Sequence, residues 1–168
     1  MNRTATTLAR TRFVRTVRRS TALLALACAL PVAWADSREI PASAMLPVYK
    51  QECAACHMAY PPGMLPASSW SRMMTRLDQH YGTDASLDAA MVRQIGTWLE
   101  AHAGTYKRVR EAPPQDRITQ SAWFERKHRD VEPAVWKRAA VGSRANCMAC
   151  HTRADQGDFD DDRVRIPK

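Results

Sequence analysis

Two short motifs contain four of the five cysteines of the chain, and each motif ends in a histidine. They are Cys53-Ala54-Ala55-Cys56-His57 and Cys147-Met148-Ala149-Cys150-His151. Two thiols three positions apart lie near one another on a helical turn, so they can add to the two vinyl groups of one porphyrin. The histidine that follows is then held beneath the iron and becomes its axial ligand. The motifs therefore predict two covalently bound haem c groups.

Three other interpretations of the cysteine pairs explain less. A four-thiolate zinc site usually has about 15–20 residues between its pairs, whereas Cys56 and Cys147 are 91 positions apart. A thioredoxin-like redox pair is expected beside a βαβ pattern, and the sequence shows no strand alternation. Structural disulfides are typical of exported proteins, but they give the histidine after each pair no role.

Three histidines remain for the two distal iron positions, since His57 and His151 are proximal by motif. His80 follows His57 by 23 residues, and His128 precedes His151 by 23 residues, so each can reach its own haem from a neighbouring helix. The alternatives are a hydrogen bond to a backbone carbonyl for His80 and a solvated helix face for His128. His102 ranks third, because it ends a helix where an imidazolium favours the helix dipole.

Methionine is the other possible distal ligand. Four methionines near the first motif could serve as its distal ligand: Met64, Met73, Met74 and Met91. Methionines at helical spacing pack more often than they ligate, and Met148 is confined within its own motif. Bis-histidine ligation is therefore favoured for both haems. It leaves no open iron position, which indicates electron transfer at low potential rather than catalysis.

Residues 1–35 have the composition of a secretory signal peptide. Six arginines without an acidic residue precede an apolar run over 21–32, and Ala33-Trp34-Ala35 is a small-x-small cleavage site. The run is shorter than the roughly 20 residues that span a bilayer. We expect a mature chain from Asp36 in the periplasm, without a membrane span and without Cys28. Cleavage lowers the net charge from +8 to +2, leaving 19 basic and 17 acidic residues. The basic composition is therefore no evidence for nucleic-acid binding.

Apolar periodicity predicts short helices joined by loops, an all-α fold with extended loops. The expected helices lie within 41–57, over 70–81 after a cap at Ser68 or Ser69, over 87–102 after a cap at Asp84 or Ser86, over 123–131, and from Pro133 onward. Three prolines make 60–66 an extended loop. The charged segment 106–115 reads as a linker, which predicts an N-terminal haem domain over 36–112 and a C-terminal haem domain over 113–168.

Much of the mature chain resembles the small dihaem cytochrome c family of proteobacteria. The resemblance is carried by His80-Tyr81-Gly82, Trp123-Phe124, Lys127-His128 and the segments 52–57, 59–63, 65–66, 69–70, 85–88, 117–119, 147–151, 154–155, 157–159 and 165–167. It implies two small domains, the first like a class I cytochrome c, each with one bis-histidine haem. The implied iron ligands are His57 with His80 and His151 with His128, and no histidine of the family pattern matches His102. Relatives pass electrons from a membrane cytochrome b to an oxygen-binding monohaem cytochrome, so redox proteins are the expected partners.

The leading hypothesis is therefore a periplasmic electron carrier, not an enzyme. A haem enzyme or gas-binding protein is the alternative, and it requires a five-coordinate haem with His128 at the surface. A third hypothesis is a subunit of a larger membrane complex, in which an acidic run steers a basic partner. That run consists of Asp158, Asp160, Asp161 and Asp162, and runs of this kind are commonly solvated tails.

Overall fold

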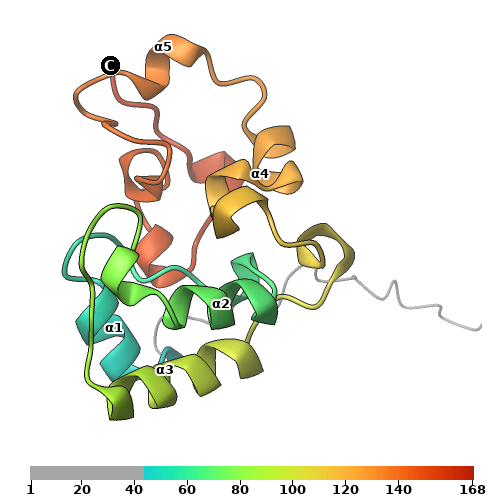
Figure 1. Cartoon of the computed structure of the whole chain (residues 1–168). Helices are drawn as coiled ribbons and strands as arrows, with labels where there is room; N and C mark the ends of the chain where they lie inside the picture. The colour runs from blue at the N-terminus through green and yellow to red at the C-terminus, as the bar shows by residue number, and fades with distance from the viewer. Residues whose placement is uncertain (1–43) are drawn as a thin grey trace, which may run out of the picture. The chain divides into compact units, whose positions relative to one another are not determined.

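The computed structural model describes residues 44–168, and the predicted signal peptide lies outside them (Figure 1). The α-helices of this part are α1 Pro47–Cys53, α2 Ala67–Met74, α3 Ala89–Ala101, α4 Ala122–Lys127 and α5 Pro133–Trp136. Short 3₁₀ helices and loops connect them, and within these residues the only β pairing is two isolated bridges. The expected all-α class is confirmed. No helix in this part is long and apolar enough to cross a membrane.

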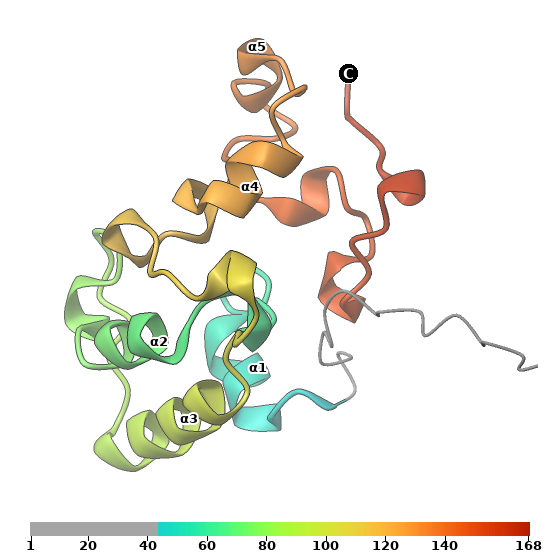
Figure 2. The ribbon, with the colours of Figure 1, turned by 90° about the vertical axis from the view of Figure 1, so that its right-hand side faces the viewer.

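Helices α2 and α3 lie side by side and form the main core with α1 (Figure 2). Leu65, Ile95 and Leu99 are completely or almost completely buried between them. Burial of each such side chain contributes roughly 1.5–3 kcal/mol. The other buried members of this core are Met45, Tyr49, Ala59, Trp70 and Met74. The indole N–H of Trp70 donates to the carbonyl of Pro62 at 2.8 Å, which fixes the proline-rich loop against α2.

Helix α2 is shorter than the sequence predicts, and its expected cap is wrong. The helix begins after Pro66, which makes no side-chain cap, rather than after Ser68 or Ser69. It ends at Met74, where the hydroxyl of Thr75 donates to the carbonyl of Arg72 and so competes with the helical bonds. His80 consequently lies beyond α2, in a turn that follows the 3₁₀ helix Leu77–Gln79.

Helix α3 starts later than expected. Its cap is Asp88, whose carboxylate accepts hydrogen bonds from the backbone N–H groups of Ala90 and Met91. Asp84 instead accepts from the backbone N–H of Ser86 within the preceding loop. A cap at Asp88 satisfies two of the four free N–H groups of the helix start.

At Gly104, the segment after α3 is hydrogen-bonded to the main core. The N–H of Gly104 donates to the carbonyl of Leu65 at 2.8 Å. A Cβ atom at Gly104 would collide with the side chain of Val109 and the carbonyl oxygen of Gly63. Only glycine allows this close approach, so the expected linker over 106–115 begins as a packed segment, with Val109 buried.

The second part of the chain buries few apolar side chains. In residues 113–168 the buried hydrophobic side chains are Phe124, Val135, Val141 and Ala154. The expected helix from Pro133 is present as α5, and α4 is capped by the hydroxyl of Ser121. Acidic residues of the predicted tail form ion pairs, including Asp160 with Arg163 at 2.9 Å and Asp161 with Lys127 at 3.4 Å. So small a core leaves room for a large apolar cofactor.

Candidate haem-binding sites

Two cavities of about 480 and 470 Å³ contain the residues of the two motifs. We call them the first cavity, which holds the residues of the first motif, and the second cavity, which holds those of the second. The first is lined by Cys53, Cys56, His57 and His80, among others. The second is lined by His128, Cys147, Cys150 and His151, among others. Apolar and aromatic side chains dominate both linings, as expected for a porphyrin site.

Helix α1 and the turn after α2 position the histidines of the first cavity. Helix α1 ends at Cys53, so Cys56 and His57 follow it in a turn. The ring centres of His57 and His80 are 6.1 Å apart, and their planes are inclined by 29°. Nδ1 of His57 lies 2.7 Å from the carbonyl oxygen of Met58. A carbonyl only accepts, so Nδ1 carries the proton and Nε2 keeps its lone pair for a metal.

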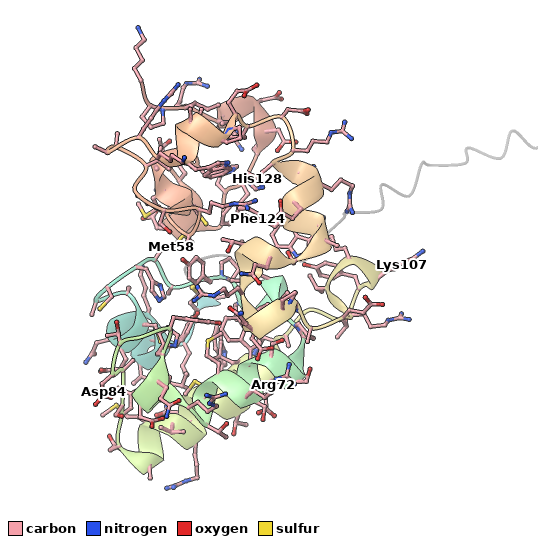
Figure 3. All side chains as sticks on the ribbon, turned by 45° about the horizontal axis from the view of Figure 1, so that its top comes forward. Met58, Arg72, Asp84, Lys107, Phe124 and His128 are labelled. Atoms are coloured by element: carbon pink, nitrogen blue, oxygen red, sulfur yellow. The ribbon has the colours of Figure 1, made fainter. Side chains whose placement is uncertain are left out.

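Helix α4 and the second motif position the histidines of the second cavity. The ring centres of His128 and His151 are 6.2 Å apart, and their planes are inclined by 77°. Nδ1 of His128 donates to the carbonyl of Phe124 at 2.9 Å, which again leaves Nε2 free. Figure 3 shows Phe124 and His128 close together, and their rings stack with centres 3.9 Å apart.

Both ring separations suit one metal ion between two imidazoles. Two metal–imidazole bonds of about 2 Å, with about 1.1 Å from each nitrogen to its ring centre, separate the centres by about 6 Å. The observed values are 6.1 Å for His57 and His80 and 6.2 Å for His128 and His151. In the described residues, no three or more His, Cys, Asp or Glu side chains gather into a single metal-binding group.

Burial favours the uncharged form of three motif cysteines and two histidines. It raises the pKa of the Cys53 and Cys147 thiols to about 11, and it also raises the pKa of Cys150. Burial lowers the pKa of His80 and of His151, and the facing histidine of each pair lowers it further. A neutral imidazole is the form that binds a metal. The four motif cysteines are free thiols, so their sulfur atoms are available for thioether bonds.

His102 lines neither cavity. It follows the last residue of α3, and its Nδ1 donates to the carbonyl of Trp98 at 2.7 Å. The methionines are distributed differently. Met73 and Met74 line the first cavity and Met64 lines the second, whereas Met91 lines neither.

Sequence reasoning predicted Cys147 as a haem-binding cysteine, but not that the two cavities share lining residues. Cys147 and Ile118 line both of them, so the two sites are direct neighbours. Trp123 and Arg144 line the second cavity, and their side-chain nitrogens Nε1 and Nε are buried without an acceptor. The sequence marked Trp123 as an apolar helix position and as part of the family resemblance, and no pattern singled out Arg144.

The family profile of dihaem cytochrome c matches residues 49–159. This chain belongs to the dihaem cytochrome c family. The X-ray structure of the diheme cytochrome c from Shewanella baltica OS155 is 37% identical, covering 76% of this chain and 95% of that one, with a TM-score of 0.65. DHC purified from Rhodobacter sphaeroides is 44% identical over 68% of this chain and 97% of that chain, with a TM-score of 0.61. A comparison with curated proteins found no match.

Membership of the dihaem cytochrome c family gives the chain two covalently bound haem c groups, as the motifs predict. It also gives the protein a role in haem-based electron transfer, and proteins of this family are generally electron carriers rather than enzymes. Cytochromes c are typically exported, and their partners are redox proteins. The linings of both cavities fit a haem, because each contains the two cysteines and the histidine of its motif, a second histidine and apolar side chains.

Proposed function

We propose that this dihaem cytochrome c is a periplasmic electron carrier in which two histidines ligate each iron. The ligands are His57 and His80 for the haem in the first cavity, and His151 and His128 for the haem in the second. The thioether cysteines are Cys53 and Cys56 for the first haem, and Cys147 and Cys150 for the second. The main support is the separation of about 6 Å between the two rings of each pair.

Each haem would supply a one-electron couple between ferric and ferrous iron. The same two histidines would ligate the iron in both oxidation states. The hydrogen bonds from Nδ1 of His57 and of His128 to backbone carbonyls orient the rings and raise the basicity of Nε2. Two neutral histidines favour the ferric state more than a methionine does, so both potentials are expected to be low. Cys147 and Ile118 line both cavities, so the two haems would be held as direct neighbours.

The proposed partners are redox proteins outside the cytoplasm. By resemblance, electrons arrive from a membrane cytochrome b and leave to an oxygen-binding monohaem cytochrome. The signal peptide predicted over 1–35 supports a periplasmic location. We also propose that residues 36–112 form the domain that binds the first haem and residues 113–168 the domain that binds the second. Each cavity nevertheless takes lining residues from both sides of that boundary, such as Met64 in the second and Arg117 in the first.

Spectroscopy of the oxidised protein tests the proposed ligands. We expect two low-spin haems and no sulfur-to-iron charge-transfer band. The near-parallel rings of the first pair and the steeply inclined rings of the second should give distinct electron paramagnetic resonance signals, the larger maximum g value belonging to the second. A high-spin haem that binds carbon monoxide readily in the unmutated protein would contradict the proposal and favour a five-coordinate enzyme or gas sensor.

Substitution of the distal histidines separates them from His102. His80→Ala and His128→Ala should each convert one haem to a high-spin form that binds carbon monoxide. His102→Ala is the matched control, because His102 makes the same Nδ1 hydrogen bond as His128 but lines neither cavity. Its spectra should equal those of the unmutated protein. Unchanged spectra in His128→Ala would overturn the assignment of that ligand.

A further inference from the structure

The side chain of Tyr60 joins the segment after the first motif to the segment before the second. Its hydroxyl donates to the carbonyl of Ala145 at 2.7 Å, across 85 positions of the sequence. Hydrogen bonds of Arg72 and Tyr81 also connect the two parts of the chain, but they end at residues 115–116, near the start of the second part. The bond of Tyr60 reaches much farther, to a carbonyl two residues before the second motif.

The ring of Tyr60 stacks on the histidine of the first motif. The ring centres of Tyr60 and His57 are 4.8 Å apart, and their planes are inclined by 28°. The backbone carbonyl of Tyr60 accepts a hydrogen bond at 2.8 Å from the hydroxyl of Tyr49, a buried residue of α1. The next residue is the fully buried Pro61, and a following proline restricts the backbone of the residue before it. These restraints hold the Tyr60 ring beside His57.

The carbonyl that Tyr60 binds belongs to the backbone that carries Cys147. The carbonyl oxygen of Ala145 also accepts from the backbone N–H of Cys147 at 3.0 Å, and Sγ of Cys147 lies 3.7 Å from it. A thioether sulfur has no hydrogen to donate, so the Tyr60 hydroxyl is the side-chain donor that stays on this carbonyl after haem attachment. Burial raises the pKa of Tyr60, and the phenol therefore remains a protonated donor.

This hydrogen bond lies in the wall that the two cavities share. Tyr60, Ala145 and Cys147 all line the first cavity, and Cys147 lines the second cavity as well. Because Cys147 is a proposed attachment point of the second haem, a displacement of this backbone would displace that haem relative to the first. Tyr60 therefore contacts a proposed iron ligand of one haem and the backbone that would carry the other.

We propose that Tyr60 is a positioning residue that sets the separation of the two haems, with its ring against His57 and its hydroxyl on the backbone that carries Cys147. The inference rests on the proposed function, because it requires a haem at each motif. The Coulomb interaction between two redox centres varies inversely with their separation, and electron exchange between them falls steeply as the separation grows. Loss of the hydroxyl therefore weakens both and leaves the four histidine ligands in place.

The test compares two variants of the haem-loaded protein. Tyr60→Phe keeps the ring beside His57 and removes the bond to Ala145. Ser143→Ala is the control, because it removes a different bond of the same segment, in which the backbone N–H of Ala145 donates to Oγ of Ser143 at 3.1 Å, and Ser143 lines neither cavity. Nuclear magnetic resonance at successive stages of reduction measures the potential of each haem with the other oxidised or reduced, and the rate of electron exchange between them.

We expect Tyr60→Phe to reduce the effect of each haem's oxidation state on the potential of the other and to slow the exchange severalfold, while both haems stay low-spin. The backbone N–H of Cys147 should exchange with solvent about fivefold faster, as the loss of one hydrogen bond predicts. Ser143→Ala should keep the potentials and the exchange rate. In the unmutated protein, the ring signals of Tyr60 should shift in two steps, one as each haem is reduced. This readout is independent of whether a variant folds.

The outcomes separate this inference from the proposed function. If Tyr60→Phe keeps the potentials and the exchange rate of the unmutated protein, Tyr60 does not set the separation of the haems, and the electron carrier stands. Equal changes in Ser143→Ala, or ring signals of Tyr60 that respond to one haem alone, would overturn the inference in the same way. If the unmutated protein carries fewer than two haems or a high-spin haem, the proposed function itself fails.

Discussion

At the scale of single residues, the hydrogen bond of Nδ1 does not distinguish a ligand from an ordinary histidine. His57, His128 and His102 all donate from Nδ1 to a nearby backbone carbonyl. His102 differs because its ring lies beside that of Trp98, with centres 4.8 Å apart, and within residues 44–168 it makes no ring contact with a second histidine. The presence of a second imidazole in the same cavity therefore supports the assignment of each histidine as an iron ligand. The hydrogen bond of Nδ1 only sets the tautomer of the ring.

Tyr81 holds the turn that presents His80. Its hydroxyl lies 3.2 Å from the carbonyl oxygen of Gln115 and 3.1 Å from that of Asp116. All three residues have positive φ angles, between 52° and 56°, which non-glycine residues rarely adopt. Three unfavourable backbone conformations persist only when surrounding contacts hold them. The phenol thus joins two strained segments directly beside the proposed distal ligand.

Tyr81→Phe should weaken the binding of His80 to the first haem. The loss of the shared hydrogen bond is expected to lower the free energy of unfolding by about 1 kcal/mol, and the reduced protein should bind carbon monoxide at the first haem to a greater extent. Tyr106→Phe is the control, because it removes a bond to the carbonyl of Gly63. A similar loss of stability in both variants with no carbon monoxide binding would show that Tyr81 does not position His80.

At the scale of elements, an ion pair ties the 3₁₀ helix Pro114–Asp116 to α2. Nε and Nη2 of Arg72 donate to the two carboxylate oxygens of Asp116 at 3.0 and 2.6 Å. The Asp116 side chain is only 18% exposed. Hydrogen bonding by Arg72 holds the pKa of Asp116 below its usual value of 3.8. The folded protein therefore binds this proton less tightly than the unfolded chain.

The pair should make the fold sensitive to acid. Its contribution is complete above pH 4 and is lost as the pH falls from about 3.8 through the lower pKa of the folded state. Asp116→Asn should lower the free energy of unfolding by about 1 kcal/mol at pH 7 and by much less at pH 2. Denaturant titrations at both pH values measure this difference. Asp130→Asn is the control, since the pair of Asp130 with Arg129 is almost fully exposed. Equal losses at both pH values would contradict the role of the ion pair.

Some of the helices could be predicted from the sequence, and others could not. The motifs, α5 and the presence of α4 could be predicted, because spacing and proline position are local properties. The end of α2 could not. Leu77 and His80 keep the helical period because both line the first cavity, but a 3₁₀ turn rather than α2 brings them there. Periodicity reports which side chains are buried, and different backbones can bury the same set. Trp123 and Arg144 come to the same cavity only through the fold.

At the scale of the whole described chain, the two cavities differ in charge. The second has four cations and two carboxylates in its lining, and the first has one cation and three carboxylates. Positive surroundings favour the ferrous state, since the ferric haem carries one more positive charge. The proposed ligands are two histidines at both sites, so charge should decide which haem is reduced first.

We predict that the haem of the second cavity has the higher midpoint potential, by about 60 mV or more, equivalent to at least a tenfold preference for the electron. Nuclear magnetic resonance spectra at successive stages of reduction measure the order. Asp84→Asn should raise the potential of the first haem only, while Asp155→Asn, in neither cavity, should change neither potential. Earlier reduction of the first haem would contradict the electrostatic argument.

The wall shared by the cavities also bears on how the protein is made. Ile118 and Cys147 come late in the polypeptide, yet both enclose the site of the motif that emerges first. A porphyrin attached to Cys53 and Cys56 during export would therefore stay partly exposed to solvent until the far end of the chain arrives. The two attachment reactions are consequently coupled through folding, and loss of the later motif should leave the earlier haem inadequately covered.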